Sequence, residues 1–326
     1  MNIAFFSTQP YDRKYFESEQ TKHHLKFFDA VLDEQTLNLA TGCTAVCAFV
    51  NDRLNAAVIK ELAALGITII ALRCAGFNNV DVAAAREHHI KVVRVPAYSP
   101  HAVAEHALAL IMTLNRKTHK AYNRVREGNF SLDRLTGFDL YGKTVGVIGT
   151  GKIGACFANI MMGMGCKVLA YDISTDATLQ SAGVQYVPIA ALLSQSDIVS
   201  LHCPLTTETT HLVNKDSLQK MKRGAMLINT SRGGLVNTHD VIRSLKSGQL
   251  GYVGIDVYEQ EAKLFFHDLS ENIIEDDVIL RLMSFPNVLI TAHQGFLTEE
   301  ALTQIAKVTL GNINDFEQGR GLENEV

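Results

Sequence analysis

The apolar positions of the first hundred residues follow two alternating periods. Short runs of nearly continuous apolar residues predict buried strands, and stretches in which apolar residues recur every three or four positions predict helices. The predicted strands are residues 2–6, 25–28, 44–49, 68–71 and 91–94, and the helices between them include residues 54–65 and 80–88. Strands that alternate with helices in this way are typical of a parallel sheet covered by helices.

A second series of the same kind follows the segment PAYSP (residues 96–100), which breaks the pattern. A long helix is predicted from His101 to about Asn115, and a last one from Thr298 to about Phe316. The strands of this series are predicted at residues 144–148 and 167–171 and near Gln185, Ile198, Ala225, Tyr252 and Val288. The pattern therefore predicts a second parallel sheet.

The length of the chain agrees with two domains, because 326 residues exceed the roughly 250–300 that a single core usually holds. If the last helix packs on the first sheet, the chain crosses between the domains twice. We therefore predict an α/β protein with two doubly wound parallel-sheet domains. One comprises residues 1–99 plus 297–326, and the other comprises residues 100–296.

A glycine-rich loop, GTGKIG (residues 149–154), lies between the predicted strand 144–148 and a helical pattern. Glycines allow a sharp turn, a close approach to a pyrophosphate and tight packing of the helix on the sheet. Amide groups at the start of the helix then face the diphosphate, and Asp172, which ends the next strand, accepts from ribose hydroxyls. An ordinary tight turn is the alternative, but strand, helix and acid in this register favour a dinucleotide site.

Three further segments follow predicted strands of the second domain, NTSRGG (229–234), DVYEQE (256–261) and TAHQGF (291–296). Because the carboxyl ends of parallel strands meet at one edge of a sheet, we expect these segments to lie beside the glycine loop. They bring Arg232, Glu261 and His293 to that edge.

These three side chains match what the reduction of a 2-oxo acid requires. A guanidinium binds the substrate carboxylate with two hydrogen bonds, and an imidazolium donates a proton as hydride arrives. A carboxylate beside the imidazole orients it and favours its charged form. Taken singly, Arg232 could be a surface cation, His293 a loop histidine and Glu261 a solvated acid like Glu259. Together, beside a nucleotide loop, they favour catalysis.

With DIVSLHCP (197–204), these motifs make the chain resemble the D-isomer-specific 2-hydroxyacid dehydrogenases over essentially its full length. Within that family it is most similar to the fermentative D-lactate branch. The resemblance implies a flavodoxin-like substrate domain, a Rossmann NAD-binding domain and an active site in the cleft. It also implies the reversible, NADH-dependent reduction of pyruvate to D-lactate, with the roles above assigned to Arg232, Glu261 and His293.

The resemblance implies further cofactor contacts. Lys152 and Ile153 would lie at the pyrophosphate, and Asp256 would accept from the nicotinamide carboxamide. An acid at position 172 repels a 2′-phosphate, so we expect NAD rather than NADP. The complete predicted cofactor set is Gly149, Gly151, Lys152, Ile153, Gly154, Asp172, Cys203, Pro204, Thr209, Thr230, Ser231, Arg232 and Asp256.

The same resemblance indicates how the substrate is held. Backbone amides of Ala75 and Gly76 would contact its carboxylate, and Tyr98 resembles the tyrosine that donates a hydroxyl to it in the lactate branch. Phe296 would close the side-chain pocket and favour a methyl group, which points to pyruvate. A hydrophobic pocket distinguishes one methylene by only about 1–3 kcal/mol, so slightly larger 2-oxo acids are expected as weaker substrates.

The composition of the chain indicates which kinds of binding partner to expect. A net charge of −4 and a pI near 6.3 provide no basic surface for nucleic acid or an anionic membrane. The six cysteines are scattered without zinc-site spacing, so we expect reduced thiols, no metal and a cytoplasmic location. Residues 1–6 do not resemble a signal peptide, and no apolar run is long enough for a membrane span. The resemblance implies a homo-oligomer, a dimer or a tetramer.

Two other functions remain to be distinguished. A glyoxylate or hydroxypyruvate reductase of the same family is disfavoured by Tyr98 and by the insertion at residues 263–276. An NADH-sensing regulatory protein that kept the fold is disfavoured because Arg232, Glu261 and His293 are all present. A panel of 2-oxo acids separates these alternatives.

Overall fold

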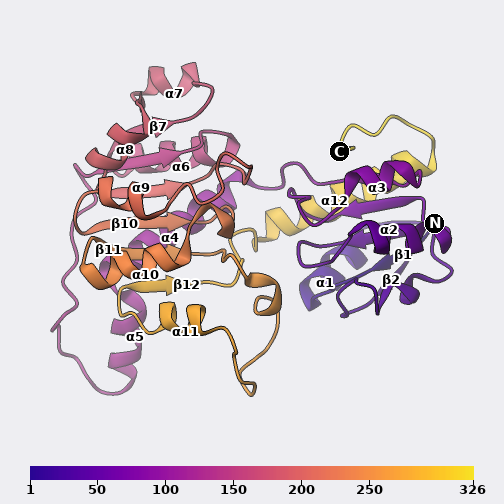
Figure 1. Ribbon diagram of the computed structural model, residues 1–326, viewed down its shortest axis with the longest axis horizontal. Coiled ribbons are helices and arrows are strands. Elements are labelled where there is room, and N and C mark those ends of the chain that lie inside the picture. Colours follow the sequence, from indigo (N-terminus) through magenta and orange to yellow (C-terminus); the bar gives the residue numbers. More distant parts are fainter. The chain divides into compact units, whose positions relative to one another are not determined.

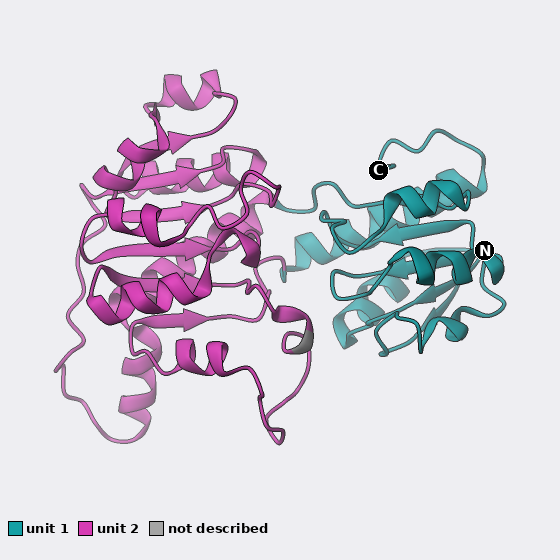
Figure 2. Cartoon of the chain, in the orientation of Figure 1, with its two compact units in different colours: residues 1–99, 297–326 teal, residues 100–296 magenta. Residues whose placement is uncertain are grey.

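The computed structural model, whose elements are labelled in Figure 1, describes residues 1–262 and 264–326. The chain forms two compact units, which Figure 2 colours separately. Unit 1 consists of Met1–Ser99 and Leu297–Val326, and unit 2 consists of Pro100–Phe296. Lys263, the first residue of the insertion named above, lies outside the described residues.

Unit 1 is built on a sheet of five parallel strands in the order β2-β1-β3-β4-β5. This is the order of flavodoxin-like folds, as predicted. β3 and β4 are buried along their whole length, which explains their uninterrupted apolar sequences. The strands are β1 (Asn2–Phe5), β2 (His24–Phe27), β3 (Ala45–Ala48), β4 (Ile69–Leu72) and β5 (Lys91–Val93).

The helices of unit 1 include one that the sequence pattern did not reveal. This helix, α1 (Pro10–Ser18), is rich in polar residues and buries only Asp12 and Phe16. It packs against α12 (Glu299–Glu317), which also contacts β4, and the end of the chain thereby completes unit 1. The other helices are η1 (Leu37–Ala40), α2 (Ala56–Ala64) and α3 (Val82–Glu87).

Unit 2 is built on a sheet of seven parallel strands in the order β12-β11-β10-β9-β6-β7-β8. From β6 the chain adds β7 and β8 on one side of the sheet and then β9 to β12 on the other, as in the Rossmann fold. This strand order confirms the predicted fold class. The strands are β6 (Thr144–Ile148), β7 (Lys167–Tyr171), β8 (Gln185–Tyr186), β9 (Ile198–Leu201), β10 (Ala225–Asn229), β11 (Leu250–Ile255) and β12 (Val288–Ile290).

Helices cover both faces of this sheet and bury a core on each. One core lies against α4 (Pro100–Arg116) and α6 (Lys152–Gly163), and the other lies against four shorter helices. These four are α8 (Ile189–Gln195), α9 (Lys215–Lys220), α10 (Thr238–Ser247) and α11 (Asp277–Met283). The remaining helices are α5 (Thr118–Arg126), α7 (Ala177–Ala182), η2 (Gly233–Leu235) and η3 (Glu261–Lys263).

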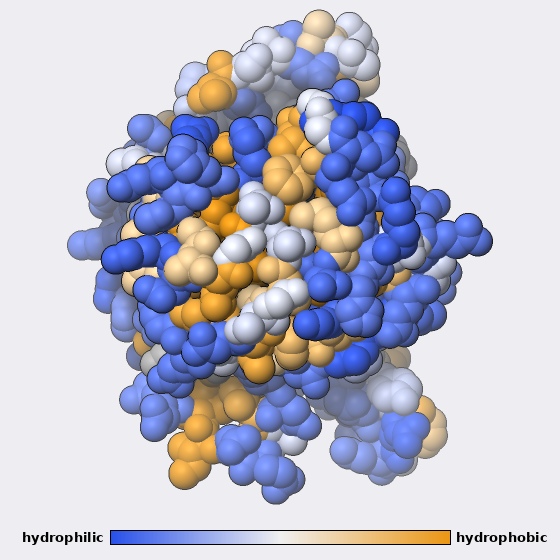
Figure 3. Space-filling model, turned by 90° about the vertical axis from the view of Figure 1, so that its right-hand side faces the viewer, coloured by the Kyte–Doolittle hydropathy of each residue, from blue (hydrophilic) through white to orange (hydrophobic). Residues whose placement is uncertain are grey.

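Two features of the surface complete the description of the fold. The sequence pattern also missed α5, which is polar in composition and buries none of its side chains. In Figure 3, hydrophobic residues gather in the middle of one face within a border of hydrophilic ones. Apolar surface of this kind is common on proteins, so it does not by itself indicate a binding site. None of the helices described has both the length and the apolar character to cross a bilayer.

Candidate active site

The glycine loop after β6 has room for backbone but not for side chains. Gly149 has a φ of +91°, and a Cβ there would lie 2.6 Å from the backbone nitrogen of Cys203. A Cβ at Gly154 would lie 1.9 Å from the carbonyl oxygen of Gly149, so only glycine lets α6 start this close to the loop. At Gly151, by contrast, no atom lies within 4 Å of the Cβ position. The start of α6 therefore faces open space, into which a diphosphate fits.

Asp172 follows β7 and turns its carboxylate toward the glycine loop. Its Oδ2 accepts from the backbone nitrogen of Thr150 at 2.5 Å and from the Thr150 hydroxyl at 3.1 Å. Burial opposes ionisation, but these hydrogen bonds and one from the Ser174 amide hold the pKa of Asp172 below its ordinary value. The site thus carries a fixed negative charge at the end of β7, which fits a ribose with free hydroxyls and repels a phosphate there.

The loops after β9 and β10 are joined to each other. The Ser231 hydroxyl donates to the Cys203 carbonyl at 2.7 Å, and the Thr209 hydroxyl donates to the Pro204 carbonyl at 2.7 Å. Thr230 Oγ1 is buried and has no hydrogen-bond partner among the described residues. A buried hydroxyl without a partner is costly unless a ligand supplies one, so this atom also fits a bound cofactor.

Arg232 follows β10 and is half-buried, with its Nη1 donating to the Ser231 carbonyl at 2.7 Å. The next residue, Gly233, lies against the backbone of Tyr258. A Cβ at position 233 would be 2.1 Å from the carbonyl carbon of Tyr258, so only glycine allows this close approach. The chain around Arg232 therefore packs directly on the backbone of the segment that carries Glu261.

His293 and Glu261 form an ion pair. The Nδ1 of His293 lies 2.9 Å from Oε1 of Glu261, and the two side chains are 16% and 23% exposed. The other oxygen of Glu261 accepts from the backbone nitrogen of Tyr258 at 2.9 Å, which fixes the carboxylate. The ring of Phe266 lies 5.9 Å from that of His293, centroid to centroid. With Nδ1 held in this way, Nε2 is the ring nitrogen that can exchange a proton with a substrate.

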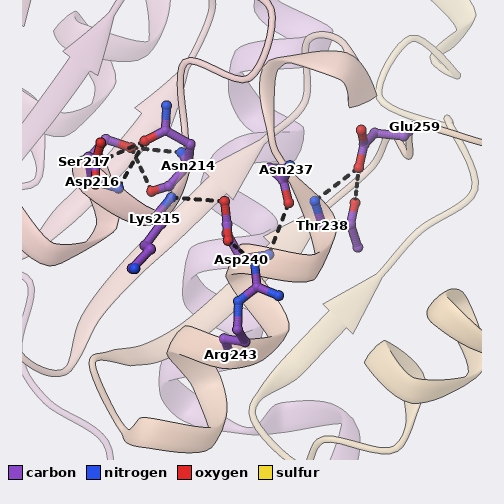
Figure 4. Close-up of polar contacts among 9 residues, drawn as sticks. All are labelled: Asn214, Lys215, Asp216, Ser217, Asn237, Thr238, Asp240, Arg243 and Glu259. Atoms are coloured by element: carbon purple, nitrogen blue, oxygen red, sulfur yellow. Dashed lines mark hydrogen bonds and ion pairs between the residues drawn. The ribbon is translucent and has the colours of Figure 1, made fainter.

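The neighbouring acid, Glu259, serves the fold instead, as Figure 4 shows. One of its oxygens accepts from both the backbone nitrogen and the hydroxyl of Thr238 at the start of α10, at 2.9 and 2.5 Å. The other lies 2.7 Å from Nε2 of His211. Glu259 thereby ties together the loops that precede α9 and α10. Of the two acids, only Glu261 reaches His293.

Asp256, at the end of β11, is only 1% exposed and holds the loop of His293. Its carboxylate accepts from the Thr291 hydroxyl at 2.5 Å and from the backbone nitrogens of Gln294 and Gly295 at 2.9 and 2.8 Å. Burial opposes its charge, but hydrogen bonds, foremost one from His106, keep the pKa of Asp256 below its ordinary value. The contact with a nicotinamide carboxamide stays a prediction.

His106 is a residue of this site that sequence reasoning missed. It lies on α4, half-buried, and its Nε2 is 3.0 Å from Thr291 Oγ1 and 3.3 Å from Asp256 Oδ1. In the sequence it is one polar position on a helix about 150 residues before Asp256, so no local signal links the two.

The predicted substrate residues belong to unit 1, apart from Arg232 and Phe296. Ala75 and Gly76 lie in the loop after β4, where Nη1 of Arg94 donates to the Ala75 carbonyl at 2.8 Å. Tyr98 is half-buried in the segment that ends unit 1, and Phe296 is 7% exposed at the end of unit 2. Within the described part of the chain, no group of three or more His, Cys, Asp or Glu side chains is arranged to hold a metal ion.

Comparison with known proteins decides the family. Residues 108–295 match the family model described as "D-isomer specific 2-hydroxyacid dehydrogenase, NAD binding domain". The chain belongs to this family. The match spans the glycine loop, Asp172 and the His293–Glu261 pair, so unit 2 carries the family's NAD-binding domain. The predicted membership, the NAD cofactor and the enzyme class, an NAD-dependent 2-hydroxyacid dehydrogenase, are confirmed.

The similarity to other 2-hydroxyacid dehydrogenases extends over whole chains. D-lactate dehydrogenase of Escherichia coli is 52% identical over 328 residues, covering 100% of both chains. The apo-structure of D-lactate dehydrogenase from Escherichia coli matches with a TM-score of 0.92 at 50% identity, again over 100% of both chains. The pyruvate reductase of Chlamydomonas reinhardtii matches with a TM-score of 0.94 at 47% identity, over 99% of this chain and 98% of the other.

Proposed function

We propose that this 2-hydroxyacid dehydrogenase is a D-lactate dehydrogenase that reduces pyruvate with NADH, reversibly. The observation that carries the proposal is the His293–Glu261 pair, which follows strands of the same sheet as the glycine loop and Asp172. The full-length similarity to enzymes named D-lactate dehydrogenase supports the choice of substrate.

In this mechanism each side chain has one task. The start of α6 binds the diphosphate of the cofactor, and Asp172 binds its ribose. When bound, NADH supplies the hydride to the carbonyl carbon. Arg232 binds the carboxylate of pyruvate with two hydrogen bonds and polarises the adjacent carbonyl. His293 donates the proton on Nε2 to the carbonyl oxygen, and Glu261 orients its ring and favours the charged form. In the direction of oxidation His293 takes the proton back.

Residues other than these bind the rest of the substrate and limit its size. We propose that the amides of Ala75 and Gly76 and the hydroxyl of Tyr98, all in unit 1, bind the substrate carboxylate. Phe296 would close the pocket around the methyl group. Each additional methylene then costs about 1–3 kcal/mol, so 2-oxobutyrate is expected to be a poorer substrate than pyruvate.

The decisive experiment measures NADH oxidation with pyruvate, 2-oxobutyrate, glyoxylate and hydroxypyruvate, followed by chiral analysis of the product. We expect the highest kcat/KM with pyruvate and D-lactate as the product. Faster turnover of glyoxylate or hydroxypyruvate would make the protein a reductase of that kind. Tight NADH binding without turnover of any 2-oxo acid would instead indicate a regulatory protein.

We also propose that the protein is a homo-oligomer and works in the cytoplasm. Large apolar side chains on α5 and in the segment that follows it are mostly exposed, which favours a contact with a second copy. They are Tyr122 (62%), Val125 (51%), Phe130 (74%), Leu132 (81%) and Tyr141 (82%). None of the six cysteines, all of which are described, forms a disulfide, in agreement with a reducing compartment. Light scattering on the protein and on a Phe130→Ser/Leu132→Ser variant tests the oligomer; an unchanged mass for the variant argues against this surface.

A further inference from the structure

His106 contacts the loop of His293 without belonging to it. Its side chain, 15% exposed, extends from α4 to the ends of β11 and β12. There its Nε2 lies 3.0 Å from Thr291 Oγ1 and 3.3 Å from Asp256 Oδ1. The Cβ position of Gly295 is 3.0 Å from Asp256 Oδ2 and 3.5 Å from Cδ2 of His106, so the loop packs closely on both side chains.

The direction of these hydrogen bonds follows from Asp256. Its pKa is below the ordinary value, so the carboxylate is charged and can only accept. The Thr291 hydroxyl, at 2.5 Å, donates its one proton to this carboxylate. Nε2 of His106 therefore carries a proton and donates it toward Thr291 Oγ1 and Asp256 Oδ1. His106 completes the set of donors around a charge that is almost fully buried.

Asp256 in turn fixes three consecutive amides of the loop. Its backbone carbonyl accepts from the nitrogen of His293 at 2.8 Å. Its carboxylate accepts from the nitrogens of Gln294 and Gly295 at 2.9 and 2.8 Å. Within this loop His293 has a φ of +54°, a left-handed backbone conformation that is uncommon for residues other than glycine. The same conformation gives the ring its contact with Glu261.

The helix that carries His106 is a rigid support. A Cβ at Gly254 of β11 would lie 2.9 Å from Cδ1 of Ile228 and 3.1 Å from Cδ1 of Leu114 on α4. This close approach fixes α4 against the strand that ends just before Asp256. His106 is thus held in place from a part of the fold that carries none of the proposed catalytic side chains.

We propose that His106 is a positioning residue, which acts through Asp256 and Thr291 to hold His293 in its working conformation. The proposal rests on the proposed function, in which His293 is the proton donor. It does not make His106 a catalytic residue, because His106 contacts the loop and not the reacting atoms. Its loss should therefore affect turnover more than the binding of either substrate.

The test compares His106→Leu, which removes the donor, with His106→Gln, whose amide can donate from nearly the same place. We expect His106→Leu to lower kcat for pyruvate about 10- to 100-fold, with the KM for pyruvate and the Kd for NADH within about twofold of wild type. His106→Gln should recover most of the loss. His239→Leu, an exposed histidine of α10, is the matched control and should be unchanged.

A readout that does not depend on the substrate separates this proposal from the proposed function. Hydrogen–deuterium exchange of a peptide that spans residues 288–298 reports the amides of Gln294 and Gly295. We expect faster exchange in His106→Leu and in Thr291→Val, even if pyruvate proves not to be the substrate. Unchanged exchange in both variants, or equal losses of kcat in His106→Gln and His106→Leu, overturns the proposal. If His106→Leu does not fold, Thr291→Val and His106→Gln decide the question.

Discussion

Glu261 and His293 lie 32 positions apart in the sequence, yet Oε1 of the first and Nδ1 of the second are 2.9 Å apart. The pair forms because β11 and β12 are neighbouring parallel strands whose carboxyl ends meet at one edge of the sheet. Its geometry leaves Nε2 of His293 free for proton transfer, and several outcomes are expected from this arrangement.

Replacement of His293 by alanine should lower kcat for pyruvate reduction by about two to four orders of magnitude, the contribution of a positioned general acid. NADH should still bind, because its proposed contacts lie on other loops. Steady-state kinetics and NADH fluorescence titration measure the two effects. His239→Ala serves as the control, since this histidine is exposed on α10 and should keep full activity.

Glu261→Gln and Glu259→Gln should have different consequences. Glu261→Gln should lower kcat for pyruvate reduction at least about tenfold, because the ring of His293 loses the carboxylate that holds its Nδ1. Glu259→Gln should mainly lower the urea midpoint, because Glu259 accepts from Thr238 and His211. Steady-state kinetics and urea unfolding of both variants provide the comparison. An unchanged kcat in Glu261→Gln would refute the assignment.

Arg232→Ala should weaken the binding of pyruvate far more than that of NADH, because it removes the guanidinium proposed to bind the carboxylate. We expect the KM for pyruvate to rise at least about tenfold. Arg223, exposed in the turn before β10, provides the matched control. An unaltered KM for pyruvate in Arg232→Ala contradicts the proposed role.

Asp172→Ala should relax the preference for NADH over NADPH, because it removes the charge that repels a 2′-phosphate. It should also weaken NADH binding, since the carboxylate accepts two hydrogen bonds from Thr150 and steadies the glycine loop. The ratio of kcat/KM for the two cofactors is the measurement. Asp176→Ala removes a carboxylate that caps α7 and should leave this ratio unchanged; a ratio unaffected by Asp172→Ala would count against the ribose contact.

His202 should make the protein sensitive to mild acid. Burial against the Phe157 ring, 4.8 Å away, lowers the pKa of His202 to about 3 from 6.5. Between these pH values the unfolded chain binds the proton and the folded chain does not, so the free energy of unfolding falls as the pH drops from about 6.5. Above that pH the residue has no effect.

Urea unfolding at about pH 7.5, 6 and 5 measures this loss of stability. On acidification, His202→Gln should lose less unfolding free energy than wild type. The difference between the two proteins is at most about 1.4 kcal/mol per pH unit, and solvent contact of the half-buried His202 makes it smaller. Parallel losses in wild type and variant would show that other groups cause the acid sensitivity.

The sequence by itself was sufficient where a feature depends on neighbouring residues. The strand, glycine loop, helix and Asp172 are contiguous, and their order requires the turn that the structure contains. The predicted strands likewise match the twelve strands of the described residues to within a few positions. The sequence signal is clearest for β3, β4, β9 and β10, whose residues are all buried. α1 and α5 were missed because both are rich in charged and polar residues and bury two side chains and none, respectively.

Only the tertiary structure decided which side chains act together. Taken alone, Glu261 resembled its neighbour Glu259, and the family resemblance assigned the role beside His293 to Glu261. In the structure Glu261 contacts His293, whereas Glu259 accepts from Thr238 at the start of α10. The sequence offered no reason to connect His106 with Asp256, since that contact depends on how closely α4 lies against β11. Local patterns determine the elements because backbone preferences and burial act over a few residues. Which distant side chains meet depends on how the completed elements pack. A single sequence does not directly encode the distance between such side chains.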